Sequence, residues 1–534
     1  MKKKVFWVLM IIGFITFSIV YHNNRKVKPE ELAASVKTNT KIESYIPKES
    51  YKGRVFYEVF VRSFKDSNGD GVGDLRGLTE KLDYLSDLGI KGLWITPINE
   101  SPSYHCYDIT NYYGINPMYG TMEDFENLIK EAHKRDMMVI MDLVLNHTSA
   151  YHPWFRAASN DRNSPYRNYY VWSDKNTNLK EVSSIDTRPW IKLKAFSSDY
   201  YYAIFSGTMP DLNYDNTEVR QQAKNIAKYY LNIGVDGFRL DGAKHIYDKE
   251  TDKNLVWWKE FSDFVKAENK NAVLVGEIWD KPEITAAYLT SIDTDFNFTA
   301  ADDILSALSK NNLSNLSGKL KDIYNIYEKY NHNYTDSPFL SNHDTPRIMT
   351  SVLDAENITE DPSDKAKEAA AILLTLPGTP YVYYGDETGM KGTKPDEQIR
   401  EPFIWDNVDR KQNTSWETSV NHPDNIALSV LKDKPDSIYN FYKAMIHLRN
   451  SSEVLKYGNY DKVEVKNTNI MAYKRVLDGK EIYVFINGNK TDKKENISLN
   501  KFNVLYSNKR NDKELNLSSE LTIISNEILI IEAK

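Results

Sequence analysis

The sequence predicts an α/β protein: a (β/α)₈ TIM barrel with a domain inserted after its third strand and an antiparallel β-sandwich at its C-terminal end. Three observations predict this class. Short apolar segments alternate with helical patterns eight times, which is the strand count of such a barrel. The alternation pauses once, in a polar and aromatic stretch at 148–213. After residue 452 it gives way to two-residue alternation with Asp-Gly and Asn-Gly turns, which is typical of antiparallel hairpins.

The first three predicted strands lie at 55–64, 91–98 and 137–147. Leucines spaced three and four residues apart at 75–90 predict an amphipathic helix between the first two strands. We expect Thr121 to cap the next helix, in which apolar residues again share one face. These units form the first part of the predicted barrel.

The alternation resumes after the pause with a helix near 217–232 and five more strand candidates. These strands lie at 234–241, 271–279, 294–298, 337–344 and 379–387, and the third of them is the weakest. The resulting domains are an N-terminal segment and linker at 1–50, the barrel at 51–147 and 214–452, the inserted domain at 148–213 and the β-sandwich at 453–534.

The N-terminal segment predicts export. Three lysines precede an apolar run of 17 residues from Val5 to Tyr21, just long enough for a membrane span. No small-x-small cleavage site follows closely, so an uncleaved anchor is favoured, and a cleaved signal stays open as the alternative. The lysines would remain cytoplasmic. We therefore expect the rest of the chain to be extracellular or attached to the outer face of the membrane.

Composition excludes some classes of function. A formal charge of −7 without a long basic stripe beyond the N-terminus argues against a nucleic-acid partner. The single cysteine, Cys106, rules out an intramolecular disulfide. Aromatic residues make up 12% of the chain, which suits sugar stacking but is more often core filler. We expect a monomer that acts on a small or polymeric substrate.

Polar and charged side chains gather where predicted strands end, and in a barrel enzyme the C-terminal ends of the strands carry the active site. They are Asp142, Asn146 and His147 on the third strand, Arg239, Asp241, Lys244 and His245 on or after the fourth, Glu277 on the fifth, and His343 and Asp344 on the seventh. A single strand-end aspartate is usually a helix cap or turn former. Three carboxylates on different strands, with histidines between them, instead indicate one converging site.

Glycoside cleavage is the chemistry that fits this set. One carboxylate attacks the sugar, and a second protonates the leaving oxygen and later activates water. Arg239 lies two residues before Asp241, so both share a face of the strand, and its charge would keep that aspartate ionised. The apolar neighbours of Glu277 predict burial and a raised pKa, as a general acid requires.

Several segments carry a resemblance to a known family. "DLVLNH", "GFRLDGAKH", "GEIWD" and "FLSNHD", in this order and spacing, resemble the signature segments of the α-amylase family, glycoside hydrolase family 13. The stretches at 103–121 and 209–216 are similar to two further signatures of that family. The likeness covers about residues 51–534. It implies a retaining enzyme that works through a covalent glycosyl–enzyme intermediate.

The resemblance implies roles for the matching residues. Asp241 would be the nucleophile, Glu277 the general acid and base, and Asp344 the stabiliser of the transition state. Tyr107 would stack under the sugar ring and Asp108 would hold its hydroxyls. The full set of implied substrate-binding residues is Tyr107, Asp108, His147, Arg239, Lys244, His245 and His343. Relatives usually carry glycine where this chain has Cys106, which leaves the geometry of that loop open.

Two features of the resemblance narrow the expected activity. Gly242 follows the expected nucleophile where oligo-1,6-glucosidases tend to carry valine, and "MPDLN" resembles a subgroup between oligo-1,6-glucosidases and neopullulanases. We therefore expect endo-type hydrolysis of α-1,4 bonds in starch and maltodextrins. An α-glucosidase or neopullulanase and a transglycosylase remain alternatives. A non-catalytic membrane-anchored relative is disfavoured, because all three carboxylates and both histidines are present.

The stretch "DSNGDGVGDL" at 66–75 predicts a calcium site, because side-chain oxygens at alternate positions with glycines between them let a short loop wrap a hard cation. Gly77 stands where an EF-hand needs glutamate, so this is not a calcium sensor loop. The expected ligands are Asp66, Asn68, Asp70, Asp74 and the carbonyl of Val72. A turn that binds no ion is the alternative. The resemblance also implies a second calcium, held by Asn146, Asp211 and the carbonyl of His245, and leaves its presence open.

Overall fold

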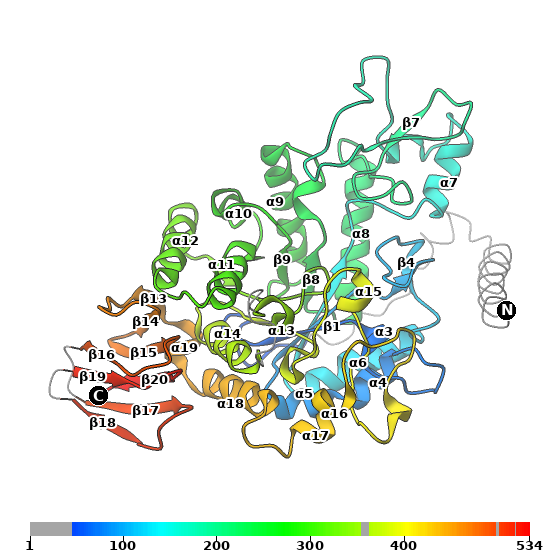
Figure 1. The fold of residues 1–534 in the computed structure, drawn as a ribbon. Helices are drawn as coiled ribbons and strands as arrows, with labels where there is room; N and C mark the ends of the chain where they lie inside the picture. Colours follow the sequence, from blue (N-terminus) through cyan, green and yellow to red (C-terminus); the bar gives the residue numbers. More distant parts are fainter. Residues whose placement is uncertain (1–44, 354–361, 498–500, 518–519) are drawn as a thin grey trace.

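The computed structural model describes residues 45–353, 362–497, 501–517 and 520–534. At its centre is an eight-stranded parallel sheet in the order β11–β10–β9–β8–β5–β2–β1–β12 (Figure 1). The strands are β1 (Phe56–Val59), β2 (Gly92–Ile95), β5 (Met138–Leu143), β8 (Gly237–Leu240), β9 (Val273–Gly276), β10 (Thr294–Phe296), β11 (Thr335–Ser337) and β12 (Tyr381–Tyr383). The N–H groups of Thr379 and Tyr381 donate to the carbonyls of Asp336 and Pro338, which brings β12 beside β11 and closes the ring. The predicted (β/α)₈ barrel is confirmed.

All eight observed strands are shorter than predicted, and two of the differences bear on the site. The apolar run at 55–64 is strand only as far as Val59, and its end forms α3 (Val61–Phe64), whose four residues are all buried. The apolar composition of 55–64 reflects burial and does not require an extended backbone throughout. The strand predicted at 337–344 is β11, which ends at Ser337. The loop that follows it carries His343 and Asp344 above the barrel.

Helices surround the strands (Figure 1). The helix predicted at 75–90 is divided at Lys81 into two, α4 and α5. The expected cap at Thr121 is confirmed, because its hydroxyl accepts from the N–H of Asp124 and its own N–H donates to the Asp124 carboxylate. The barrel helices are α4 (Leu75–Glu80), α5 (Leu82–Leu88), α6 (Met122–Lys134), α8 (Thr217–Ile233), α9 (Thr251–Glu268), α10 (Pro282–Tyr288), α11 (Phe298–Ser309), α12 (Leu316–Tyr330), α14 (Ser363–Thr375) and α18 (Ile438–Ser451).

The residues between β5 and α8 form a lobe that stands at the top of Figure 1, far from the C-terminal sheet. The lobe contains α7 (Pro153–Asn160), the turn η2 (Arg167–Tyr169) and a hairpin of β6 (Trp190–Lys192) and β7 (Tyr200–Tyr202). A backbone bridge between His147 and Asp211 ties the end of the lobe to the end of β5. A two-stranded ribbon of β3 (Asn99–Glu100) and β4 (Asn111–Ile115) lies in the loop after β2.

The C-terminal residues form antiparallel sheets, as predicted. A six-stranded sheet contains β13 (Asn459–Lys462), β14 (Ile470–Leu477), β15 (Lys480–Asn487), β20 (Ile528–Ala533), β17 (Lys501–Ser507) and β18 (Glu514–Asn516), and β16 (Lys493–Asn496) pairs with β19 (Glu520–Ile523). Phe485 of the large sheet and Ile523 of the small one share a buried cluster, so the two sheets form a sandwich. Asp478 and Gly479 join β14 to β15 with φ of 48° and 78°, which a two-residue hairpin turn requires.

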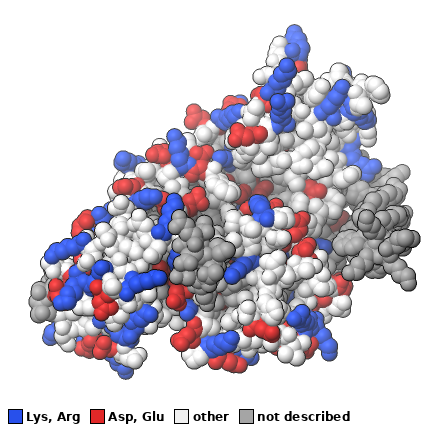
Figure 2. Space-filling view, in the orientation of Figure 1, with Lys and Arg blue, Asp and Glu red and all other residues white. Residues whose placement is uncertain are grey.

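Short helical turns complete the connections. They are α13 (Ile348–Ser351), α15 (Asp396–Ile399), α16 (Pro423–Ile426), α17 (Leu428–Leu431), α19 (Glu453–Tyr457), η3 (Ala243–His245), η4 (Asp386–Thr388) and η5 (Arg410–Gln412). None of the helices in the described ranges combines the length and the apolar character that a bilayer crossing needs. The N-terminal run that predicts a membrane segment lies outside those ranges. Figure 2 shows acidic and basic residues interspersed over the visible face of the barrel and the C-terminal domain.

Candidate active site

A cavity of about 280 Å³ opens above the C-terminal ends of the barrel strands. It is lined by His105, Tyr107, His147, Phe205, Met209, Asp241, Glu277, Asp344, Asp396 and Arg400. Asp241 directly follows β8, Glu277 directly follows β9, and Asp344 lies in the loop after β11. The structure therefore brings the three predicted carboxylates together with Tyr107 and His147.

A single buried guanidinium group connects the carboxyl groups beneath this cavity. Nη1 of Arg239 lies 2.7 Å from Asp142 Oδ1 and 2.6 Å from Asp241 Oδ1, and its Nη2 lies 2.8 Å from Glu277 Oε2. Burial raises the pKa of Asp241 and Glu277, and the Arg239 charge opposes this rise without reversing it. Burial likewise raises the pKa of Asp142 to about 7. The single Arg239 charge is shared among three carboxyl groups, so it only partly offsets the effect of burial on their pKa values.

Asp344 lies in the opposite electrostatic environment. Its Oδ2 is 3.0 Å from Nε2 of His343, and its Oδ1 accepts from Nη2 of Arg400 at 2.8 Å. Burial by itself would raise the pKa of Asp344, but these two cations outweigh burial and hold the pKa well below its usual range. Asp344 is therefore the carboxylate that stays ionised.

His343 is held between two carboxylates. Its Nδ1 lies 2.6 Å from Oε1 of Glu58, and its Nε2 faces Asp344. Burial alone would lower the pKa of His343, but the two carboxylates raise it to about 10. The ring of Tyr107 stacks on that of His343 with centroids 5.4 Å apart, and its hydroxyl lies 2.6 Å from Nε2. A positive imidazole therefore supports both Tyr107 and Asp344 at the cavity floor.

His147 differs from His343 because no carboxylate of the described residues pairs with it. Its Nε2 lies 3.2 Å from the carbonyl of Tyr107, and burial lowers its pKa to about 4. It is thus a neutral imidazole at neutral pH, suited to hydrogen bonding with an uncharged ligand.

Five of the predicted substrate-binding residues do not line the cavity, and two of them, Arg239 and His343, contact the carboxylates that do. Asp108 lies behind its wall, where the hydroxyls of Ser101 and Ser103 donate to it. Nζ of Lys244 donates to the carbonyl of Trp279 and to the carboxylate of Asp280. His245 turns its Nδ1 to Ser184 Oγ at 3.1 Å, and its ring meets the edge of Phe205. The side chains of Lys244 and His245 thus lie behind the residues that line the cavity.

Six residues of the site were missed by sequence reasoning, and two of them are His105 and Met209, which line the cavity. Arg400 and Asp396 come from α15 and its C-terminal end, Phe205 comes from the inserted lobe, and Glu58 comes from β1. Only Glu58 carried a usable signal, because it is the one charged residue in the four residues of β1 and is 1% exposed. A buried acid in an apolar strand requires a partner.

The loop at Cys106 adopts the conformation that a glycine would favour. Cys106 has φ of 61° and is fully buried. Its Sγ lies 3.4 Å from Nδ2 of Asn116 and 3.8 Å from the hydroxyl of Tyr119. The left-handed backbone explains why glycine suits this position, and the buried contacts of the thiol accommodate the side chain.

The loop at 66–75 is organised by its own side chains. The Asp66 carboxylate accepts from the N–H groups of Asn68, Gly69 and Gly71, and Asp70 accepts from the N–H of Val72. Asp74 caps α4 by accepting from the N–H of Gly77. In the described part of the chain no three His, Cys, Asp or Glu side chains gather closely enough to hold a metal. The loop nevertheless offers carboxylate, amide and carbonyl oxygens alone, which is the donor chemistry that calcium prefers.

A stronger indication of a cation lies at Asn146 and Asp211. Oδ1 of Asn146 is buried and has no hydrogen-bond partner in the described residues. Burial raises the pKa of Asp211 well above its usual range, and the neighbouring Asn146 side chain only partly offsets this. An unpartnered amide oxygen beside a buried carboxylate is the arrangement that a cation would satisfy.

Comparison with known proteins agrees with the geometry. The family model described as alpha amylase, catalytic domain, matches residues 58–458. The chain is 45% identical over 449 residues to alpha-amylase 3 of Dictyoglomus thermophilum, covering 83% of this chain and 86% of that protein. It is 32% identical to the 4-alpha-glucanotransferase of Thermotoga neapolitana, covering 81% and 95% of the two chains.

A solved structure shows the same similarity in three dimensions. The crystal structure of the alpha-amylase from H. orenii superposes with a TM-score of 0.83 at 40% identity. The superposition covers 90% of this chain and all of the other.

Proposed function

The chain belongs to the α-amylase family, and from this premise we propose that it is an endo-acting α-amylase that hydrolyses α-1,4 bonds in starch and maltodextrins with retention. It is an enzyme of the glycoside hydrolase class, in a family whose members also transfer glycosyl groups. The observation that carries the proposal is the contact of one guanidinium, Arg239, with both Asp241 and Glu277. Such a shared contact keeps the two carboxyl groups close, which suits a nucleophile and leaves little room for a water between them.

In the proposed mechanism, Asp241 attacks the anomeric carbon while Glu277 gives its proton to the departing glycosidic oxygen. The raised pKa of Glu277 supports this role, because an acid must still hold its proton at neutral pH. Glu277 then takes a proton from water, and that water hydrolyses the glycosyl ester on Asp241. The Arg239 guanidinium beside Asp241 offsets part of the burial that disfavours the ionised, attacking form of this carboxyl group.

The remaining groups of the cavity would position the sugar. Asp344, held ionised by His343 and Arg400, would bind hydroxyls and stabilise positive charge developing on the ring. Tyr107, held flat by its stack on His343, offers its ring face to the pyranose. His147, being neutral, would hydrogen-bond a hydroxyl without adding a charge near the nucleophile.

The preference for α-1,4 bonds is supported by the residue after Asp241. Gly242 has φ of 50°, and a Cβ built there would lie 3.0 Å from Cζ of the Phe205 ring. Valine would therefore have to displace Phe205, which forms part of the cavity wall. The small residue keeps this side of the cavity open to the next sugar of the chain.

Product analysis tests the proposed activity. Purified protein should release a mixture of short maltodextrins from starch early in the reaction, and it should cleave maltotriose without forming longer sugars. Release of glucose alone, or action on α-1,6 bonds alone, would overturn the proposal. Longer products from maltotriose would favour the second candidate, transglycosylation, which the similarity to a 4-alpha-glucanotransferase supports.

We further propose that the loop at 66–75 binds calcium through Asp66, Asn68, Asp70, Asp74 and the carbonyl of Val72, and that Asn146, Asp211 and the His245 carbonyl can hold a second ion. The unpartnered Oδ1 of Asn146 supports the second ion. Bound calcium would supply positive charge to these oxygens, and Asp74 would keep its place at the start of α4. Metal counting on the purified protein would distinguish no ion, one ion and two.

We also propose that the protein is exported, through the apolar N-terminal run, to the outer face of the membrane or beyond, and acts as a monomer. The three lysines before that run support this orientation. N-terminal sequencing of the exported protein would separate an anchor from a cleaved signal. A cytoplasmic location of the full-length chain would contradict the proposal.

A further inference from the structure

Glu58 is a buried acid that no step of the proposed mechanism uses. It lies on β1 between two apolar neighbours and is 1% exposed. Because β1 pairs with β2 on one side and β12 on the other, this acid is part of the barrel wall. Removing a carboxylate from water costs free energy unless a partner of opposite charge faces it. For Glu58 that partner is His343.

Both hydrogen bonds that the Glu58 carboxylate accepts within the described residues come from His343. Nδ1 of His343 lies 2.6 Å from Oε1 of Glu58, and the backbone N–H of His343 donates to the same oxygen at 3.3 Å. The two residues are 285 positions apart in the chain. The contact therefore ties the loop that carries Asp344 to the wall of the barrel.

The other ring nitrogen of His343 faces the reacting groups. Nε2 lies 3.0 Å from Oδ2 of Asp344 and 2.6 Å from the hydroxyl of Tyr107. A neutral imidazole carries a single N–H, so beside two ionised carboxylates it would turn a lone pair toward one of them. A ring that is protonated on both nitrogens donates to both carboxylates instead. The two contacts together therefore favour the imidazolium form.

The pKa values agree with this geometry. Burial alone would lower the pKa of His343, but Asp344 and Glu58 raise it to about 10. Burial raises the pKa of Glu58, and the His343 charge only partly opposes that rise. Two hydrogen bonds to one oxygen of Glu58 favour its ionised form. We therefore place the shared proton on the imidazole and the negative charge on Glu58.

Other charged and titratable groups surround this pair without displacing it. They come from β5, β8, β12 and its following turn, the loop after β2 and the end of α15, and are Asp142, Arg239, Asp241, Tyr383, Asp386, Tyr107 and Arg400. In the described part of the chain, only Glu58, Asp344 and the Tyr107 hydroxyl reach the ring nitrogens. Arg400 donates to the backbone carbonyl of His343 rather than to its ring. Glu58 and Asp344 are thus the carboxylates that set the charge of this ring.

We propose that Glu58 is a positioning residue for the reaction, which holds His343 doubly protonated so that Nε2–H is aimed at Asp344 and at the sugar hydroxyls beside it. A charged donor forms a hydrogen bond about twice as strong as a neutral one. The acid in β1 would thus strengthen the grip on the sugar without touching it. This inference rests on the proposed function, because it concerns the same site.

Glu58→Gln tests this role, because the amide keeps the size of the side chain and can accept from Nδ1 but carries no charge. We expect the pKa of His343 to fall by about two pH units, since one of its two adjacent charges is lost. NMR titration of the imidazole follows this directly, and the signal is identified by its absence from His343→Gln. A pKa of His343 that is the same in Glu58→Gln and in the unaltered protein would overturn the inference.

The activity of Glu58→Gln should change with pH in the same direction. Its His343 loses the charge at a lower pH than that of the unaltered protein. We expect kcat/KM on starch to agree within about twofold near pH 5.5 and to be about tenfold lower near pH 9. Taking the ratio of the two proteins at each pH cancels the ionisation of Glu277, which both share. A structural role alone would give a ratio that does not vary with pH, and that result would overturn the inference.

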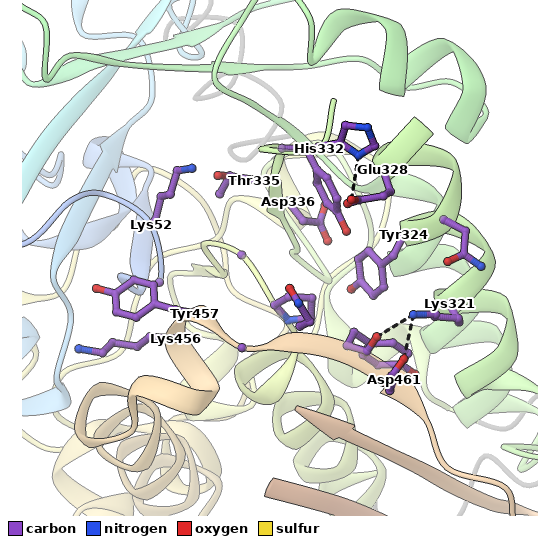
Figure 3. A pocket seen from close by; sticks show the side chains of 18 residues that line it. Lys52, Lys321, Tyr324, Glu328, His332, Thr335, Asp336, Lys456, Tyr457 and Asp461 are labelled. Carbon is purple, nitrogen blue, oxygen red and sulfur yellow. Dashed lines mark hydrogen bonds and ion pairs between the residues drawn. The ribbon is translucent and has the colours of Figure 1, made fainter. Parts of the chain in front are cut away.

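Glu328→Gln is the matched control. His332 and Glu328 form the same kind of contact, with Nδ1 3.0 Å from Oε1, in a cavity of about 580 Å³ at the opposite end of the barrel (Figure 3). Their side chains are 82% and 55% exposed, so water screens the pair. This variant should leave the pKa of His343 and the pH dependence of kcat/KM unchanged. A shift of the His343 pKa as large as in Glu58→Gln would overturn the inference.

Glu58→Asp keeps the charge but withdraws it from His343 by one carbon. The pKa of His343 should fall less in this variant than in Glu58→Gln, and an equal fall would show that the charge is not what matters. If Glu58→Gln does not fold, as judged by its melting temperature, Glu58→Asp decides alone. Its His343 should then titrate below that of the unaltered protein, and an unchanged pKa would overturn the inference.

The proposed function is read separately from the role of Glu58. The NMR titration requires no turnover, so it reports on Glu58 whatever the substrate is. A lowered His343 pKa in Glu58→Gln together with no starch hydrolysis by the unaltered protein would refute only the proposed function. Normal hydrolysis together with an unchanged His343 pKa would refute only the role of Glu58.

Discussion

The two ends of the barrel handle buried arginines in opposite ways. At the C-terminal end of the strands, Arg239 contacts three carboxyl groups that compete for one positive charge. At the other end, the equally buried Arg449 donates to four backbone carbonyls, those of Gly53, Leu374, Leu376 and Gly378, and contacts no carboxylate in the described residues. The first arrangement leaves carboxyl groups with raised pKa values, and the second gives each guanidinium nitrogen a backbone carbonyl to donate to. Competing carboxyl groups therefore mark the reacting end, and hydrogen bonds to the backbone mark the end that supports the fold.

The Glu277→Gln variant tests the difference between the two ends of the barrel with the largest expected effect. We expect hydrolysis of starch to fall by about 10³-fold, because the general acid and base is removed. Stability should be equal or higher, since one of the carboxyl groups competing for Arg239 is gone. Glu283→Gln, an exposed acid on α10, is the control and should change neither property. If the Glu277→Gln protein lost stability but still hydrolysed starch, Glu277 would support the fold rather than the reaction.

Arg449→Met probes the opposite end. The change leaves several buried carbonyls without donors, and we expect a loss of about 3 kcal/mol in the free energy of unfolding. The kcat of the folded fraction should not change, because Arg449 does not line the active-site cavity. Urea unfolding of this variant beside Arg162→Met, an exposed arginine, measures the difference. A large fall in kcat of Arg449→Met without a change in the free energy of unfolding would show that this end of the barrel also serves the reaction.

His343→Gln should move the pH dependence of activity. His343 lowers the pKa of Asp344, so its removal should raise that pKa and shift the acid limb of kcat/KM to higher pH. The pKa of His343 itself is raised to about 10 in the folded protein. Its stabilising contribution is therefore complete below about pH 6.5, the unfolded value, and lost as the pH rises through 10. The difference in the free energy of unfolding between the unaltered protein and His343→Gln should shrink as the pH rises from about 6.5 to about 10. A difference that stays constant over this pH range would contradict the prediction.

Much of this arrangement could be predicted from the sequence, and the reason is geometric. Asp241 and Glu277 are adjacent to β8 and β9 along the chain, so a correct strand assignment places them at one end of the barrel. Phe205 and Arg400 could not be placed in this way, because distant segments bring them to the cavity, and the pairing of Glu58 with the distant His343 could not be foreseen either. The direction in which burial and the Arg239 charge together shift the pKa of Asp241 could not be predicted from the sequence either. Its sign depends on burial, which outweighs the Arg239 charge predicted to lower it.

The calcium loop gives the smallest expected effect. Chelation should lower the melting temperature by about 4 °C, the shift that a small loss of stability produces, and Asp70→Ala should reduce this response to what the second proposed site contributes. Asp161→Ala is matched to it, because Asp161 accepts from the N–H of Asn163 at 2.8 Å just as Asp70 accepts from Val72. That variant should keep the full response to chelator. If chelation lowers the melting temperature of Asp70→Ala as much as that of the unaltered protein, this loop does not bind calcium.

Trapping of the glycosyl–enzyme intermediate tests the central claim most directly. The Glu277→Gln protein should react with an activated α-glucosyl fluoride, whose leaving group needs no acid, and should then release the sugar slowly because no base activates water. Peptide mass spectrometry is predicted to find one glucosyl group esterified to Asp241. A glucosyl group on another residue, or turnover with inversion and no adduct, would contradict the account.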